Sequence, residues 1–320
     1  MKLHLAAAAV VLLLSPRADT LTFAIEKGAK LDKHFELGLE FHSDTIQISI
    51  DGKPLPDEVL EKFEITMSTA VELEVEDEYR AVEKGRPSEL LRHFRKVQNH
   101  ETAHEALPAG KPKDRDETHT SPLEDHAVEF RWNAKDESWE RSFSGGEGDK
   151  ASLEPLHEDM DFLALVEGGK LEEGASWKID VAHFAELVKP GGELSFPKKK
   201  DANVQFEFGK NASGKIEASY GGTREEGGRK LAVIKLEAHV KTSQEANPDA
   251  PMPLALEGGL ELEGEYLWDL AAQHLASYSI HGPATLVATG ERTLTTKNGE
   301  ATMKMRFEFA GELKAKGRIE

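Results

Sequence analysis

The chain has 320 residues, with 40 Lys and Arg against 59 Asp and Glu, so its formal net charge is −19 at neutral pH. A surface of this sign repels phosphate groups, which argues against nucleic acid and against an anionic membrane surface as partners. The sequence contains no cysteine, which excludes a disulfide scaffold and a lipid anchor on a cysteine. Core packing must therefore stabilise the fold, and the chain is long enough to build a substantial core.

The N-terminus has the pattern of an export signal. Lys2 precedes an apolar run from Leu5 to Leu14, which at about ten residues is too short to span a membrane and typical of a signal peptide. We expect residues 1–20 to be a signal peptide, with the mature protein beginning between residues 16 and 22. No later apolar stretch reaches spanning length. The sequence thus predicts an extracytoplasmic protein, periplasmic or secreted, without a transmembrane segment in the mature chain.

Alternation of apolar and polar residues is the main local pattern. Ile46, Ile48 and Ile50 share one face of a strand, and Asp51-Gly52 after them predicts a tight hairpin turn. The same alternation runs through "EITMSTAVELEVEDEY", residues 64–79. In "HAVEFRWNAKDESWERSF", residues 126–143, two alternating runs flank a polar turn, which predicts a hairpin.

Two short helices are expected in the middle of the chain. Near residues 159–167, Asp159 or Asp161 can cap a short helix that a glycine pair ends. Near residues 181–189, Asp180 is the expected N-cap, and Pro190 with the following glycines ends the helix. Both helices are brief compared with the strands around them.

The C-terminal third returns to long alternating strands, for example with Met303, Met305, Phe307 and Phe309 on one face. The predicted fold is mainly β, with curled antiparallel sheets of a sandwich or half-barrel type and a few short helices. Two similar halves are one arrangement that this pattern allows. A break at residues 195–203, rich in lysine and containing a proline, divides the expected halves. We therefore predict an N-terminal β-rich half over 21–195 and a C-terminal antiparallel half over 196–320.

One motif suggests chemistry. His100, Glu101 and His104 have the H-E-x-x-H spacing, which on a helix gives two zinc ligands and a general base. Ser88 could cap such a helix, and apolar residues follow at helical spacing. No third histidine follows at the spacing of a metzincin, and only a distant carboxylate such as Glu124 or Glu129 could serve as the third ligand.

The segment around this motif is a weak helix former that is charged and contains proline, so a solvated loop between strands is the favoured interpretation. On that interpretation the chain has no catalytic residue, cofactor site or metal ligand. The alternative is a zinc-dependent hydrolase, with His100 and His104 as metal ligands and Glu101 as the base.

Three stretches, "VEDEYRAVEKGRP", "GASWKID" and "GGLELEGEYLWD", resemble in their layout a family of uncharacterised secreted β-rich bacterial proteins. The resemblance implies an exported β-rich protein of unknown activity and transfers no functional residue. Together with the patterns above, it favours a non-enzymatic binding or envelope scaffold protein. An apolar ligand or an envelope protein is the expected partner, because a curled one-sided sheet offers an apolar face.

Overall fold

The computed structural model describes residues 19–83, 85–108, 110–166, 169–197, 211–247, 252–296 and 299–320. Over these residues strand accounts for 67% and helix for 6%, which confirms the prediction of a mainly β protein with antiparallel sheets. None of the helices in these ranges is long and apolar enough to cross a membrane. Residues 1–18 of the predicted signal peptide and most of the predicted break at 195–203 lie outside the described residues.

The N-terminal strands are β1 (Asp19–Leu21), β2 (Lys30–Ile50), β3 (Lys53–Pro54), β4 (Glu64–Glu83), β5 (Arg86–Ala106), β6 (Lys113–Thr120), β7 (Ala127–Asn133) and β8 (Ser138–Phe143). The later strands are β9 (Gly169–Leu171), β10 (Ser176–Ile179), β11 (Ser213–Glu226), β12 (Arg229–Gln244), β13 (Leu254–Asp269), β14 (His274–Thr296) and β15 (Gly299–Ile319). The helices are α1 (Asp57–Leu60) and α2 (Phe184–Val188), with 3-10 turns η1 (Lys150–Ser152), η2 (Leu163–Leu165) and η3 (Val181–His183).

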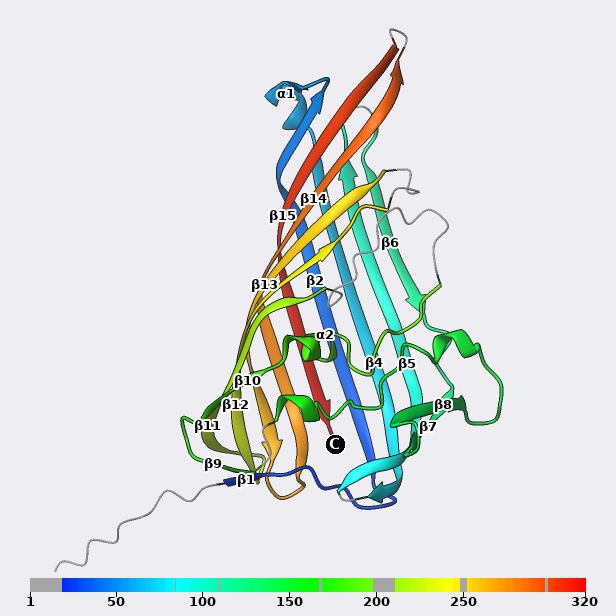
Figure 1. Cartoon of the computed structure of the whole chain (residues 1–320), viewed down its shortest axis with the longest axis vertical. Coiled ribbons are helices and arrows are strands. Elements are labelled where there is room, and N and C mark those ends of the chain that lie inside the picture. Colours follow the sequence, from blue (N-terminus) through cyan, green and yellow to red (C-terminus); the bar gives the residue numbers. More distant parts are fainter. Residues whose placement is uncertain are drawn as a thin grey trace, which may run out of the picture.

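All strands except β1 and β9 belong to one antiparallel sheet, in the order β10-β11-β12-β13-β14-β15-β2-β4-β5-β7-β8, with β3 beside β2 and β6 beside β5. Most neighbours are consecutive in sequence, as expected for strands joined by hairpins. The pairings of β2 with β4 and of β5 with β7 each skip one short strand. The pairing of β15 with β2 joins strands far apart in the sequence, and it places strands from both predicted halves in the same sheet. The sheet is curled but not closed (Figure 1).

Several local predictions are confirmed. Asp51 and Gly52 have positive φ angles of 50° and 77°, as the tight turn between β2 and β3 requires. Strands β7 and β8 form the predicted hairpin. The side chain of Asp180 accepts a hydrogen bond from the Ala182 amide at the start of η3 and α2. The predicted helix over 159–167 is only the 3-10 turn η2, because Phe162 before it has a left-handed φ of 55°.

One face of the sheet, called the inner face below, carries the core. A segment that we call the strap, residues 149–166 and 180–193, crosses this face between the β8 edge and the β10 edge and returns through α2 (Figure 1). Its two passes pair with each other, since the His157 amide donates to the Gly191 carbonyl at 2.8 Å and the Glu193 amide to the Pro155 carbonyl at 2.9 Å. The strap buries these apolar residues against the sheet: Leu153, Leu156, Met160, Phe162, Leu165, Phe184, Leu187 and Val188.

Candidate functional site

Beneath the strap, the inner face buries a group of charged and polar side chains. Lys33 on β2, Asp77 and Tyr79 on β4, and Arg92 on β5 are each at most 1% exposed. Lys33, Asp77 and Arg92 each interrupt a row of apolar residues on their strands, where alternation directs every second side chain inward. Because β2, β4 and β5 are neighbours in the sheet, the rows bring these four residues together.

The geometry within this group is that of a hydrogen-bonded ion network. Arg92 binds Asp77 with two parallel hydrogen bonds, of 2.7 Å from Nε to Oδ1 and 2.9 Å from Nη2 to Oδ2. Lys33 Nζ lies 3.0 Å from Asp77 Oδ2 and 2.8 Å from Asp161 Oδ1. Lys33 also donates to the Tyr79 hydroxyl at 3.0 Å, and that hydroxyl donates to Asp161 Oδ2 at 2.7 Å. Such charge-assisted bonds are the strong ones in protein interiors.

The network joins the strap to the sheet. Asp161 belongs to the strap, and Arg92 donates to two further strap acceptors, the carbonyl oxygens of His157 and Glu158, both at 2.8 Å. The Arg92 guanidinium also lies over the Phe130 ring, 5.1 Å from its centroid. The network therefore holds one stretch of the strap, residues 157–161, against three strands.

The environment shifts the pKa values of these groups. Burial alone would raise the pKa of Asp77, but the nearby charges of Arg92 and Lys33 outweigh it and lower that pKa. Burial and the carboxylate of Asp161 raise the pKa of Tyr79 well above its usual value. Burial and Asp161 also raise the pKa of Asp159 to about 7, although the Asp159 carboxylate accepts hydrogen bonds from the backbone amides of Asp161 and Leu163.

Farther along the same strands, towards the end of the sheet that carries α1, the inner face is mainly apolar, and partly exposed side chains lie among buried ones such as Phe41, Ile48, Met305 and Phe309. Figure 1 shows that α2 and η2 cross the sheet below this end. We call the partly exposed apolar residues on this face the apolar strip; they are Leu37, Leu39, Ile46, Ile50, Ile65, Met67, Val71, Met303 and Phe307. They lie on β2, β4 and β15, which are adjacent strands.

The H-E-x-x-H motif lies on strand β5, so both the helix and the loop that the sequence suggested there are wrong. Adjacent residues of a strand point to opposite faces, which separates Glu101 on the inner face from His100 and His104 on the outer face. The two histidines, four residues apart, are separated by about 13 Å along a strand. His100 Nε2 lies 2.8 Å from Asp116 and His104 Nδ1 2.6 Å from Asp114, so each pairs with β6.

The strand therefore does not provide the arrangement of ligands that a helical zinc motif needs. The two carboxylates considered as a third ligand have other partners. Glu124 accepts a hydrogen bond from the Val97 amide at 2.8 Å, and Glu129 pairs with Arg80 at 3.0 Å. Nothing in the geometry of this segment favours the hydrolase.

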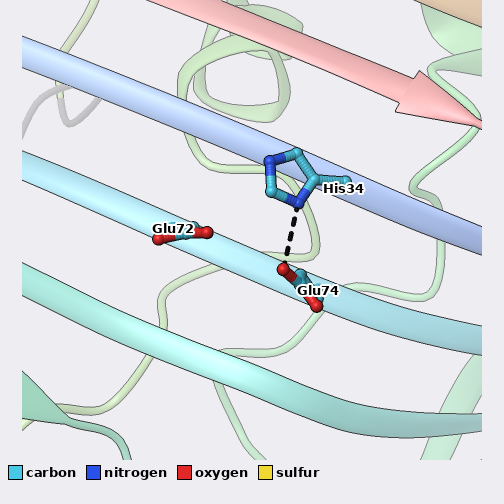
Figure 2. Close-up of side chains that lie close together, drawn as sticks. All are labelled: His34, Glu72 and Glu74. Carbon is cyan, nitrogen blue, oxygen red and sulfur yellow. Dashed lines mark ion pairs between the residues drawn. The ribbon is translucent and has the colours of Figure 1, made fainter.

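A second cluster of potential metal ligands lies on the outer face. The ligand atoms of His34, Glu72 and Glu74 lie within 4.8 Å of one another, and Figure 2 shows the His34 ring directed at Glu74 on the neighbouring strand. His34 contacts Glu74 at 3.4 Å and Glu36 at 3.0 Å, and Glu72 pairs with Lys96 at 2.7 Å. Each group is thus engaged in an ion pair of the kind that stabilises neighbouring strands.

Sequence reasoning missed the buried network, although a signal was present. Lys33 lies between Leu31 and Phe35, and Asp77 lies between Val75 and Tyr79, each in phase with an inward apolar row. A charged residue at an inward position needs a partner of opposite charge. The opposite charges in three such rows could therefore have suggested an ion network.

No model of a known protein family matches the sequence, and a search among curated proteins found no match.

Proposed function

We propose that this is an exported, non-enzymatic binding protein that holds a flexible apolar molecule, such as a fatty acyl chain, against the apolar strip. The observation that supports the proposal most is the strip itself. It places partly exposed apolar side chains of three adjacent strands on the inner face of a curled sheet. A concave apolar surface of this kind is typical of sites for small ligands.

The dimensions and the chemistry of the strip favour an elongated ligand. From Leu37 to Ile50 the strand β2 extends over about 43 Å, which exceeds the length of a common acyl chain. Burial of apolar surface stabilises a complex by about 25 cal/mol for each Å² removed from water. On the β5 side the strip is bordered by polar groups, since Thr69 donates to Asn99 at 2.7 Å and Asn99 donates to Glu101 at 3.0 Å. An amphipathic ligand would meet this border with its polar end.

The buried network supports a structural role and not catalysis. Lys33, Asp77 and Arg92 have side chains with 0% exposure and Asp161 one with 5%, so a substrate does not reach them while the strap is in place. Their hydrogen-bonding groups bind one another or the strap carbonyls. A buried polar network whose members are all satisfied rigidifies a fold, and removal of one charged partner from it is costly.

The experiment is a titration of the purified protein with a fluorescent fatty acid, followed by competition with unlabelled palmitate. We expect saturable binding that palmitate displaces. Phe307→Gln, which places an amide in the strip, should weaken binding about tenfold, the effect of roughly 1.4 kcal/mol of lost apolar contact. Arg306→Gln is the matched control, because it introduces the same residue one position away on the outer face.

Two results would contradict the proposal. The first is the absence of saturable binding by a folded protein. The second is equal affinity of both variants and the unchanged protein, which would place any ligand elsewhere. In that case an envelope protein, the other partner expected from the sequence, becomes the better candidate.

A further inference from the structure

A hollow lies between the edge strand β8 and the first residues of the strap. Its volume is about 430 Å³, and its lining includes Arg141 and Phe143 of β8 and Lys150, Leu153 and Glu154 of the strap. Figure 1 shows β8 towards the end of the sheet opposite to α1, so this hollow is separate from the apolar strip. Sites for small molecules have volumes of roughly 300 to 1,000 Å³. The hollow is therefore large enough for a small ligand.

Two cations line the hollow without a carboxylate partner. Besides Arg141, three arginines of the described residues are buried or partly buried, and each of them pairs with a carboxylate; they are Arg80, Arg92 and Arg306. Neither Arg141 nor the exposed Lys150 forms an ion pair within the described part of the chain. In a chain with 59 Asp and Glu residues, a partly buried arginine that stays unpaired is a candidate partner for an anion from solution.

The guanidinium group of Arg141 has unused donors. It carries five N–H groups, and its hydrogen bond to the described residues runs from Nη1 to the Trp139 carbonyl at 3.3 Å. Its Nε atom is buried and has no hydrogen-bond partner among those residues. A buried donor without a partner is costly, and a planar guanidinium suits two parallel hydrogen bonds to a carboxylate or a phosphate. The side chain thus lacks an acceptor that the chain itself does not supply.

The local charge favours an anion, although the whole chain is acidic. Glu154 is the carboxylate among the described lining residues, and it forms an ion pair with neither Arg141 nor Lys150. The lining thus holds two positive charges and one negative charge, in a chain whose net charge is −19. The turn η1 fixes the backbone at Lys150, since the Asp149 carboxylate accepts from the Ala151 amide at 3.0 Å. A fixed local excess of positive charge attracts small anions.

The wall of the hollow is apolar. Phe143 and Leu153 are 8% and 6% exposed, and both belong to the core. The loop after β8 packs so closely on the Phe143 ring that a Cβ on Gly148 would lie 2.4 Å from the ring atom Cε2. The main chain thus fixes the ring on one side. A ligand that fills the hollow contacts both the cations and this wall.

We propose that the hollow binds a small amphipathic anion, whose phosphate or carboxylate group contacts Arg141 and Lys150 and whose apolar part packs against Phe143 and Leu153. At about 30 Å³ for a group the size of a water molecule, the volume of about 430 Å³ suits a ligand of roughly 14 such groups. The site lies away from the apolar strip, so it holds whether or not the strip binds an acyl chain.

Isothermal titration calorimetry of the purified protein with octyl phosphate, octanoate and inorganic phosphate tests the proposal. The first two probes carry the same apolar chain on different anionic groups, and inorganic phosphate lacks the chain. We expect saturable binding of at least one amphiphile, about tenfold or more tighter than that of inorganic phosphate, because the chain buries apolar surface. The amphiphile that binds more tightly identifies the anionic group.

Matched variants locate the site. Arg141→Gln should weaken binding of the preferred amphiphile about tenfold or more, because charge-assisted hydrogen bonds are lost. Arg131→Gln is the control, since it makes the same change on the neighbouring strand β7, where Arg131 is exposed and lies 3.7 Å from Glu89; its affinity should stay within about twofold. Lys150→Gln should weaken binding about threefold. Because Lys150 is exposed, this variant reports on the site even if Arg141→Gln does not fold.

Three results would overturn the proposal. They are the absence of saturable binding of both amphiphiles by the folded protein, equal affinity for inorganic phosphate and the amphiphiles, and full affinity in the folded Arg141→Gln and Lys150→Gln variants. Phe307→Gln separates this hollow from the apolar strip. Unchanged affinity of Phe307→Gln for the amphiphile supports the hollow, whereas a loss in Phe307→Gln without a loss in Arg141→Gln places the amphiphile on the strip and excludes the hollow.

Discussion

The two ends of the inner face differ in the types of residue that occupy the inward positions of the strands. Under the strap, inward positions of β2, β4 and β5 hold Lys33, Asp77 and Arg92, all buried and paired. Towards α1, inward positions of β2, β4 and β15 hold apolar residues that stay partly exposed. Charges are buried where a second layer supplies partners, and apolar groups remain accessible beyond that layer. The covering segment thus supplies the partners that allow charges to be buried on this face.

The largest expected effect is at the covered end. Arg92→Ala leaves Asp77 in the network with one fewer partner and removes the donors to two strap carbonyls, so it should lower the free energy of unfolding by about 3 to 5 kcal/mol. Urea unfolding measures the change. Arg95→Ala is the control, because Arg95 is exposed and pairs with Asp32 and Glu76 at the surface. Equal losses from both variants would contradict the structural role of the network.

The next largest loss of stability is expected where the two passes of the strap pair with each other. Gly192 has a φ of +99°, and a Cβ there would lie 2.2 Å from the Pro155 carbonyl oxygen. Gly192→Ala should therefore cost about 3 kcal/mol, part backbone strain and part overlap. Gly145 has nearly the same φ, +101°, with open space around its Cβ position, so Gly145→Ala reports the strain alone. Thermal unfolding should show the larger loss for Gly192→Ala, and equal losses would mean that the two passes do not pack closely.

At the uncovered end the effect should be smaller. Phe307→Asp places a charge on the apolar strip, where partial exposure lets water reach it, and should cost about 2 kcal/mol. Glu308→Lys, on the outer face, should change stability by no more than about 0.5 kcal/mol. Urea unfolding compares the two. If Phe307→Asp lowered the free energy of unfolding as much as Arg92→Ala does, the strip would be as inaccessible to water as the covered end.

The smallest loss of stability is expected at Asp180, where the second pass of the strap begins. Asp180 accepts the Ala182 amide at 3.0 Å, and its replacement by alanine should cost about 1 kcal/mol. Asp180→Ser, which keeps an oxygen acceptor, should restore most of the loss. Thermal unfolding of the two variants makes the comparison, and an unchanged Asp180→Ala would show that this cap contributes nothing to the strap.

Alternation predicted the strands well, because the apolar and polar faces of a strand can be identified from the residues of that strand alone. It failed over 86–106, where Leu90, Phe94 and Val97 imitate helical spacing. The register shifts there, with Glu74 opposite Lys96 and Val75 opposite Phe94. Arg95 is then an extra residue, a β-bulge that turns both Phe94 and Val97 inward. The bulge explains the spacing, and a single sequence does not distinguish it from a helical turn.

The network depends on contacts that no single strand reveals. Arg92 faces Asp77 because β5 pairs with β4 in one register, and Asp161 reaches Lys33 across 128 positions of the chain. Local pattern identifies the inward positions, but register and the path of the strap decide which of them meet. The outer positions of His100 and His104 follow from the same register and were equally hidden.

Photolabelling tests most directly whether the inner face is divided into a sealed end and a binding end. A fatty acid with a diazirine near its methyl end is bound and irradiated, and the labelled peptides are mapped with and without excess palmitate. The account predicts palmitate-sensitive labels in residues 37–50, 64–71 and 301–309, which contain the apolar strip. Palmitate-sensitive labels confined to the outer face, or to peptides 73–79 and 153–166 at the covered end, would contradict it.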